Sequence, residues 1–132
     1  MKCLVVTPES TVLDVEASFV ALPLYDGEIG IGENHTPIVG RLGFGELRIS
    51  REKDVASYYV EGGFVEVLNN TVSLLTNRAV PSGSLNLQEA QTDLESALKK
   101  MAKTEEQLDL KDQTVAAARA RVHLAQKQKN SG

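Results

Sequence analysis

Polar and apolar residues alternate with a period of two along the chain up to about residue 84. Residues 46–51 show it most clearly, because Leu47 and Ile49 alternate with polar neighbours, as in a strand with one buried face. The same spacing recurs at Leu4/Val6, Phe19/Ala21 and Val72/Leu74. Two residue pairs that tolerate a positive φ, Asp26-Gly27 and Asn69-Asn70, separate such runs and predict tight hairpins. Many short strands joined in this way predict an antiparallel β-sandwich.

The period changes to three and four after the loop-forming cluster Pro81-Ser82-Gly83-Ser84. Asn86 is placed to cap a helix there, with Glu89 three residues on. A second helix is expected at about 112–128, after a polar connection at 104–111. The apolar positions of the first helix are Leu87, Ala90, Leu94, Ala97, Leu98 and Met101. The predicted fold is therefore α+β in sequence order, with an N-terminal antiparallel β-sandwich in residues 1–84 followed by a C-terminal antiparallel α-helical hairpin in residues 85–132.

The predicted hairpin has few large side chains to bury. In its second helix the larger apolar residues are Val115, Val122 and Leu124, and the other apolar residues are alanines. A buried Val or Leu contributes about 1.5–3 kcal/mol and a buried methyl-sized group about 0.8 kcal/mol. The composition thus predicts a mobile second helix that depends on a partner and has more than one docking position. A hairpin folded permanently on the sandwich is the alternative.

Charge and composition exclude several classes of function for this protein. The net charge is −4, with 11 acidic and 6 basic residues in 1–84 and 7 acidic and 8 basic residues in 85–132, which argues against nucleic acid as a partner. The sequence shows no signal peptide and no membrane-spanning run. Neither helix has the basic and bulky apolar faces of an interfacial anchor, so we expect no direct lipid binding. The single Cys3 fits a buried position and a reducing compartment.

Candidate chemical sites are weak. The two histidines and one cysteine lack metal-ligand spacing, and no nucleophile motif is present. The glycines between Gly27 and Gly32 are not followed by Gly-Lys-Ser/Thr, so they do not form a phosphate loop. Glu28, Glu33 and His35 could be combined as an acid–base cluster, but we do not favour this interpretation. Residues in turns more often serve backbone shape or protein contacts. We therefore predict no catalytic, cofactor-binding or metal-binding residues.

An ordered set of motifs resembles the epsilon subunit of the bacterial-type F1Fo ATP synthase. In chain order these are the glycine turn at 27–31, Asn34-His35-Thr36-Pro37, Gly45-Glu46-Leu47-Arg48-Ile49, Gly62-Gly63-Phe64-Val65-Glu66-Val67 and an alanine-rich helical hairpin. The resemblance implies a non-catalytic subunit with a ten-stranded sandwich that binds the gamma subunit and the ring of c subunits. It also implies a hairpin that extends along gamma and inhibits ATP hydrolysis.

The same resemblance suggests contact residues. Glu28 and the turn of Asn34, His35, Thr36 and Pro37 would face the c-ring, whereas Gly62, Gly63 and Phe64 would belong to the body of the sandwich. His35 could equally be a hydrogen-bonded structural residue of its turn. Arg119 and Arg121 would contact gamma or acidic segments of the alpha and beta catalytic subunits when the hairpin extends; a solvated helix face is the alternative.

One departure concerns nucleotide binding. Some bacterial epsilon subunits carry an Ile/Leu-Asp-x-x-Arg-Ala motif, and the matching stretch here is Leu85-Asn86-Leu87-Gln88-Glu89-Ala90. A glutamate in place of the arginine would repel phosphate. The leading prediction is thus a rotor subunit of a proton- or sodium-driven F-type ATP synthase, peripheral to the cytoplasmic face of a bacterial inner membrane. A nucleotide-responsive sensor that uses the same hairpin is the alternative.

Overall fold

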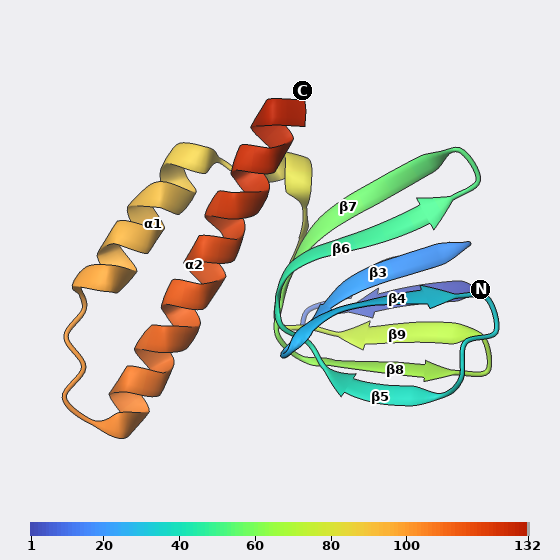
Figure 1. The fold of residues 1–132 in the computed structure, drawn as a ribbon, viewed down its shortest axis with the longest axis horizontal. Coiled ribbons are helices and arrows are strands. Elements are labelled where there is room, and N and C mark those ends of the chain that lie inside the picture. The colour runs from blue at the N-terminus through green and yellow to red at the C-terminus, as the bar shows by residue number, and fades with distance from the viewer. Residues whose placement is uncertain (132) are drawn as a thin grey trace. The chain divides into compact units, whose positions relative to one another are not determined.

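The protein was analysed as a computed structural model that describes residues 1–131. Contacts divide the chain into two compact units, one from Met1 to Pro81 and one that begins at Ser82. The division lies three residues before the boundary that the composition predicts. The first unit is called the sandwich below and the second the hairpin (Figure 1).

The sandwich contains ten strands in two five-stranded sheets. The alternating pattern predicts the sandwich, and the resemblance predicts the number of strands. One sheet has the order β2-β1-β9-β8-β5 and the other the order β10-β7-β6-β3-β4. Figure 1 labels β9, β8 and β5 of the first sheet and β7, β6, β3 and β4 of the second. Pairing is antiparallel except between β1 and β9, which run parallel. The strands are β1 (Lys2–Val6), β2 (Thr11–Glu16), β3 (Phe19–Leu24), β4 (Gly27–Gly32), β5 (Ile38–Arg41), β6 (Phe44–Arg51), β7 (Asp54–Glu61), β8 (Phe64–Leu68), β9 (Thr71–Leu75) and β10 (Ala79–Pro81).

Alternate residues of both sheets meet in one core. Leu47 and Ile49 of β6 are fully buried, as the period-two pattern predicts, and Cys3 of β1 is buried with them. Burial raises the pKa of the Cys3 thiol to about 11, because an apolar core disfavours the thiolate. The largest fully buried core side chains are Leu22, Ile31, Leu47, Ile49, Leu74, Val5, Val20, Val60, Val65 and Val67.

The two predicted hairpin turns have different outcomes. Asn69 and Asn70 form the turn between β8 and β9, with φ angles of 52° and 57°, so this prediction is confirmed. The turn between β3 and β4 is formed by Tyr25 and Asp26 instead of Asp26-Gly27, because Gly27 already pairs with Leu24. The one-residue shift has a physical reason: Gly27 takes a φ of 149°, an extended mirror-image conformation that suits the first residue of a strand after a turn.

The connection from β7 to β8 requires glycine. Gly62 and Gly63 have φ angles of 67° and 106°. A Cβ atom on Gly63 would lie 1.9 Å from the carbonyl oxygen of Leu75, so no other residue fits without backbone movement. Phe64 follows as the first residue of β8, and its side chain is exposed on the outer face of the sheet.

The second unit is a short 3-10 turn, η1 (Ser82–Ser84), followed by helices α1 (Leu87–Lys99) and α2 (Glu105–Ser131), which pack against each other (Figure 1). Asn86 caps α1 as predicted, because its side-chain oxygen accepts a hydrogen bond of 2.9 Å from the N–H of Glu89. Met101 lies outside α1 and is exposed, contrary to the predicted apolar face.

The predicted start of the second helix is wrong: α2 begins at Glu105, seven residues before the expected position. Thr104 explains the early start, since its hydroxyl oxygen accepts a hydrogen bond from the N–H of Gln107 at 3.1 Å. Glu105 and Glu106 then place negative charge in the first turn, where the helix dipole favours it. The apolar period could not reveal this segment, because its first turns are polar or exposed on most faces.

Candidate functional site

The turn of Asn34, His35, Thr36 and Pro37, called the 34–37 turn below, is tied to a distant hairpin. Asn34 has a φ of 58°, in the left-handed region that Asn tolerates. Its backbone N–H donates to Asn70 Oδ1 at 2.8 Å. Asn70 Nδ2 in turn donates to Glu33 Oε2 at 3.0 Å. One side chain from the β8–β9 hairpin therefore holds both the start of the turn and the residue that precedes it.

The rest of the 34–37 turn is presented to solvent. The side chains of Asn34, Thr36 and Pro37 are exposed, and that of His35 is half-buried. His35 Nδ1 lies 2.7 Å from the Thr36 carbonyl oxygen, which can only accept, so Nδ1 donates this bond. Pro37 fixes its own φ and restricts Thr36 to extended conformations. The turn is thus a constrained surface feature, and the bond of His35 gives that residue a structural role within it.

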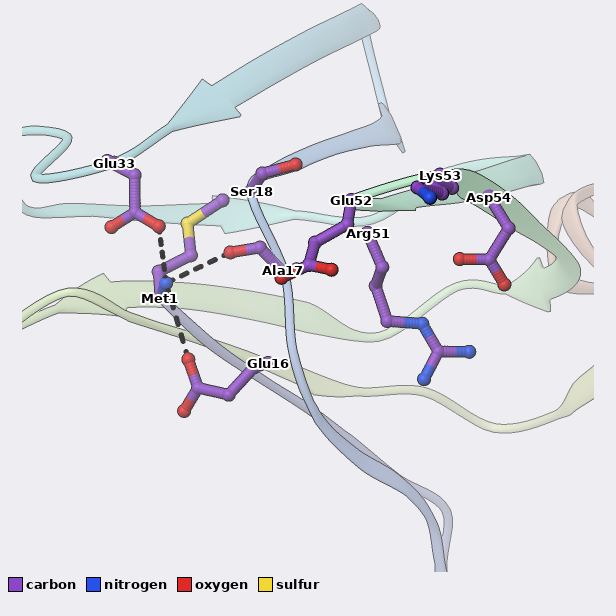
Figure 2. Close-up of a pocket in the computed structure, with 9 residues that line it drawn as sticks. All are labelled: Met1, Glu16, Ala17, Ser18, Glu33, Arg51, Glu52, Lys53 and Asp54. Atoms are coloured by element: carbon purple, nitrogen blue, oxygen red, sulfur yellow. Dashed lines mark hydrogen bonds and ion pairs between the residues drawn. The ribbon is translucent and has the colours of Figure 1, made fainter.

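The N-terminal ammonium of Met1 contacts Glu33, the residue that precedes this turn (Figure 2). It donates to Glu33 Oε1 at 2.6 Å and to the carbonyl oxygen of Ala17 at 2.9 Å, and it forms an ion pair of 3.5 Å with Glu16. The bond to Glu33 raises the pKa of the ammonium above its ordinary value. The same bond, followed by that from Asn70, lowers the pKa of the Glu33 carboxyl. Glu33 therefore joins the chain start to the 34–37 turn through Asn70.

An open hollow borders Met1 (Figure 2). Its lining mixes cations with carboxylates, so it has no single sign of charge to select a small ion. The residues that line it are Met1, Glu16, Ala17, Ser18, Glu33, Arg51, Glu52, Lys53 and Asp54.

Glu28 lies elsewhere on the sandwich. It is near the start of β4, six residues before Asn34, which corresponds to about 20 Å of extended strand. Its carboxylate accepts from Arg48 Nη2 at 2.7 Å, and Arg48 Nη1 donates to Glu46 at 3.1 Å. Ser57 adds a hydrogen bond of 2.5 Å to the same Glu46. The two carboxylates, Glu28 first, raise the pKa of the Arg48 guanidinium.

The structure therefore does not gather the predicted contact residues into one cluster. Glu28 belongs to an ion-pair network on the outer face of the β6 sheet, whereas Asn34, His35, Thr36 and Pro37 lie at the far end of β4. The acid–base arrangement considered for Glu28, Glu33 and His35 is also not formed, because each of these residues has a different partner.

The two arginines of α2 differ in their surroundings. Arg121 forms an ion pair of 3.7 Å with Asp93 of α1, and its side chain is only 13% exposed. Arg119, two residues earlier, is exposed and points to another side of the helix. In this conformation Arg121 therefore links the two helices of the hairpin.

Sequence reasoning missed Met1 and Asn70 as parts of the site. The Asn69-Asn70 pair was identified only as a turn, and its link to Asn34 spans 36 positions that no local pattern connects. Glu33 was considered only for acid–base chemistry, and its ammonium partner lies 32 positions away in the chain. The one available signal was the left-handed tendency that Asn34 shares with the Asn69-Asn70 pair.

The described residues contain neither a metal-binding cluster nor a membrane-spanning helix. In the part of the chain from residue 1 to 131, no group of three or more His, Cys, Asp or Glu side chains is arranged to hold a metal ion. Among the helices described in that part, none is long and apolar enough to cross a membrane.

Comparisons with known proteins give the family. Residues 1–82 match the family model described as ATP synthase, Delta/Epsilon chain, beta-sandwich domain. The ATP synthase epsilon chain of Rhodopirellula baltica is 43% identical over 125 residues, which cover 95% of this chain and 98% of the relative.

Solved structures share the fold. A chain in the mitochondrial ATP synthase of Euglena gracilis, from an assembly of OSCP, F1 and c-ring, has a TM-score of 0.79 at 21% identity and covers 89% of this chain and 76% of its own. A chain from the central stalk and c-ring of the Tetrahymena thermophila mitochondrial ATP synthase has a TM-score of 0.72 at 17% identity, with 94% and 95% covered. The protein therefore belongs to the epsilon chain family of ATP synthase, whose members are non-catalytic stalk subunits of the complex.

Proposed function

We propose that the chain is a central-stalk subunit that couples the gamma subunit to the c-ring through its sandwich, while its hairpin inhibits ATP hydrolysis. The observation that carries this proposal is the division into two compact units, one with a large apolar core and one with a small-residue interior. The epsilon chain relatives and the fold shared with stalk assemblies support the coupling role. Membrane association then comes through the c-ring, on the cytoplasmic face of a bacterial inner membrane.

The proposed ring contact is the 34–37 turn. Its support is geometric: the turn exposes Asn34, Thr36 and Pro37 while Asn70 and Pro37 restrict its backbone. A constrained loop loses little conformational entropy on binding, which favours a contact that must persist while a rotor turns. Glu28 is proposed as a second, separate contact on the outer face of the sheet that contains β6, where it shares Arg48 with Glu46.

The proposed inhibitory element is the hairpin in an extended state. Opening the hairpin would break the ion pair between Arg121 and Asp93, a half-exposed contact of modest strength. Arg121 and the exposed Arg119 would then be available to gamma or to acidic segments of the alpha and beta subunits. The small interior of the hairpin lowers the free energy that such an opening must overcome.

The geometry at Asn86 favours this proposal over a nucleotide sensor. The Asn86 side chain caps α1 by accepting the Glu89 N–H, and Glu89 places a carboxylate in the first helical turn. A nucleotide phosphate at this position would meet like charge. Calorimetry on the isolated chain should accordingly detect no tight ATP binding, and tight binding would favour the sensor.

Truncation tests the inhibitory role. One variant ends after Ser84 and lacks both helices; a second ends after Lys100 and lacks only α2. In the assembled enzyme both truncations should raise ATP hydrolysis while rotor attachment is retained. An unchanged hydrolysis rate in both variants would exclude the inhibitory role and leave the coupling role intact.

A matched pair of substitutions tests Glu28. Glu28→Ala and Glu46→Ala each remove one carboxylate partner of Arg48. If Glu28 contacts the ring, only Glu28→Ala should lower coupled ATP synthesis. Equal effects would mean that Glu28 acts only through Arg48, and no effect of Glu28→Ala would remove it from the interface.

A further inference from the structure

Asn69 and Asn70 share a backbone conformation but differ in what their side chains do. Both have φ angles above 50°, as a two-residue hairpin turn requires. The Asn70 side chain uses its oxygen for the Asn34 N–H and its nitrogen for Glu33. Within the described residues, the Asn69 side chain is exposed and makes no hydrogen bond. The turn itself therefore does not explain the identity of residue 70, whereas its bonds to the neighbouring turn do.

The partners of Asn70 are themselves fixed. Glu33 is held by the Met1 ammonium at 2.6 Å, and the Asn70 carbonyl oxygen accepts the Lys2 N–H at 3.1 Å. A side-chain amide is suited to this place, because it supplies one acceptor for a backbone N–H and one donor for a carboxylate. Asn34, whose left-handed backbone begins the 34–37 turn, is the last member of the hydrogen-bonded series Met1–Glu33–Asn70–Asn34.

We propose that Asn70 is a positioning residue for rotor docking, which sets the shape of the 34–37 turn through its two hydrogen bonds. This inference rests on the proposed function in one respect, namely that the 34–37 turn contacts the c-ring. Its local part, the control of the turn by residue 70, is independent of that contact. The two parts make different predictions.

Glycine substitutions separate the side chain from the backbone. Glycine adopts positive φ readily, so N70G keeps the hairpin turn and removes both side-chain bonds. N69G is the matched control, since it adds the same backbone freedom at the adjacent position and removes no bond. N70D keeps an oxygen that can accept the Asn34 N–H, but it replaces the donor to Glu33 with an oxygen of a carboxylate that repels Glu33. It therefore tests whether the bond to Asn34 persists without the bond to Glu33.

The first measurement is nuclear magnetic resonance on the full chain. We expect N70G to shift the Asn34 amide signal and to speed exchange of that amide by about tenfold, as loss of one hydrogen bond allows. N69G should leave both unchanged, and N70D should restore part of the protection. Unchanged Asn34 exchange in N70G would overturn the positioning role.

The second measurement uses the assembled complex. F1 that carries each variant is titrated onto membrane vesicles that hold the c-ring and have been stripped of F1. The expected result is a loss of about threefold in apparent affinity for N70G and none for N69G. Faster Asn34 exchange with unchanged affinity would support the local positioning role but exclude the 34–37 turn as a ring contact. The two measurements therefore distinguish failure of the proposed ring contact from failure of the positioning role.

Discussion

The sandwich and the hairpin bury their residues in different ways. The sandwich core contains large side chains such as Leu22, Ile31 and Leu74, which are fully buried between two sheets. The buried residues of the hairpin are mainly alanines, with Val115 and Leu124 as the larger exceptions. Four other large apolar side chains of the hairpin are exposed, namely Leu98, Met101, Leu108 and Leu110, and four are half-buried, namely Leu85, Leu87, Leu94 and Val122.

This difference supports the separate roles proposed for the two units. Each large aliphatic side chain buried in the sandwich contributes about 1.5–3 kcal/mol, about two to four times a buried alanine methyl. The sandwich therefore holds its own shape and can present a docking surface of fixed geometry. The hairpin has a smaller stabilising interior, which lowers the free energy of the opening that is proposed for it.

The largest expected effect comes from Gly63, where the backbone of the sandwich is least permissive. Gly63→Ala would place a Cβ atom 1.9 Å from the Leu75 carbonyl oxygen at a φ of 106°. Strain and displacement should lower the free energy of unfolding by about 3 kcal/mol or more. Gly32→Ala is the control, since its Cβ would meet nothing within 4 Å. Urea unfolding of both variants checks this, and equal midpoints would contradict it.

The next prediction compares the two units with one type of substitution. Leu74→Ala in the sandwich and Leu124→Ala in the hairpin each truncate a leucine that is at most 2% exposed. Leu74→Ala should lower the free energy of unfolding of the sandwich by about 2–5 kcal/mol. Leu124→Ala should reduce amide protection in α1 and α2 and leave the sandwich unchanged. Loss of protection in β-strands of the Leu124 variant would show that the units do not unfold independently.

Glu33 should contribute to the pH dependence of the free energy of unfolding of the sandwich. Its pKa is lowered below the ordinary value of 4.5, so the stability that it contributes is present above that value and is lost as the pH falls through the folded pKa. The Met1 ammonium has a pKa above 8.0, so its contribution is present below pH 8 and is lost as the pH rises through the folded pKa.

Glu33→Gln should flatten both flanks of the stability–pH profile. Glu16→Gln is the control, because Glu16 lies farther from the ammonium and its side chain is 84% exposed. Urea midpoints measured between pH 3 and pH 10 provide the test. A profile for Glu33→Gln that matches the unmodified chain would mean that the ion pair contributes nothing to folding.

Features of the fold could be predicted from the sequence where the interacting residues lie close together in the chain. The strand at 46–51, the Asn69-Asn70 turn and the Asn86 cap follow from residues within a few positions of each other, and each is confirmed. The early start of α2 was missed although its signal was local, because Thr104 with Gln107 is a cap pattern that apolar spacing ignores.

The candidate site was less predictable than the fold. The resemblance indicated Glu28 and the 34–37 turn, but the partners of these residues come from other strands: Arg48 for Glu28 and Asn70 for Asn34. Strand order decides such pairs, and an alternating pattern does not specify strand order. The burial of the Met1 ammonium likewise depends on three separate segments that meet at one end of the sandwich.

The smallest expected effect concerns the ion pair that joins the helices of the hairpin. Asp93→Asn removes the partner of Arg121, a contact of 3.7 Å in which the aspartate side chain is 50% exposed. Such pairs contribute about 0.2–1 kcal/mol, so the population of an open hairpin should rise by about 1.4- to 5-fold. Because opening is proposed to inhibit, ATP hydrolysis by the assembled enzyme should fall, by no more than the same factor. Glu95→Gln on the same helix is the charge-matched control, and an equal decrease there would attribute the effect to net charge rather than to the pair.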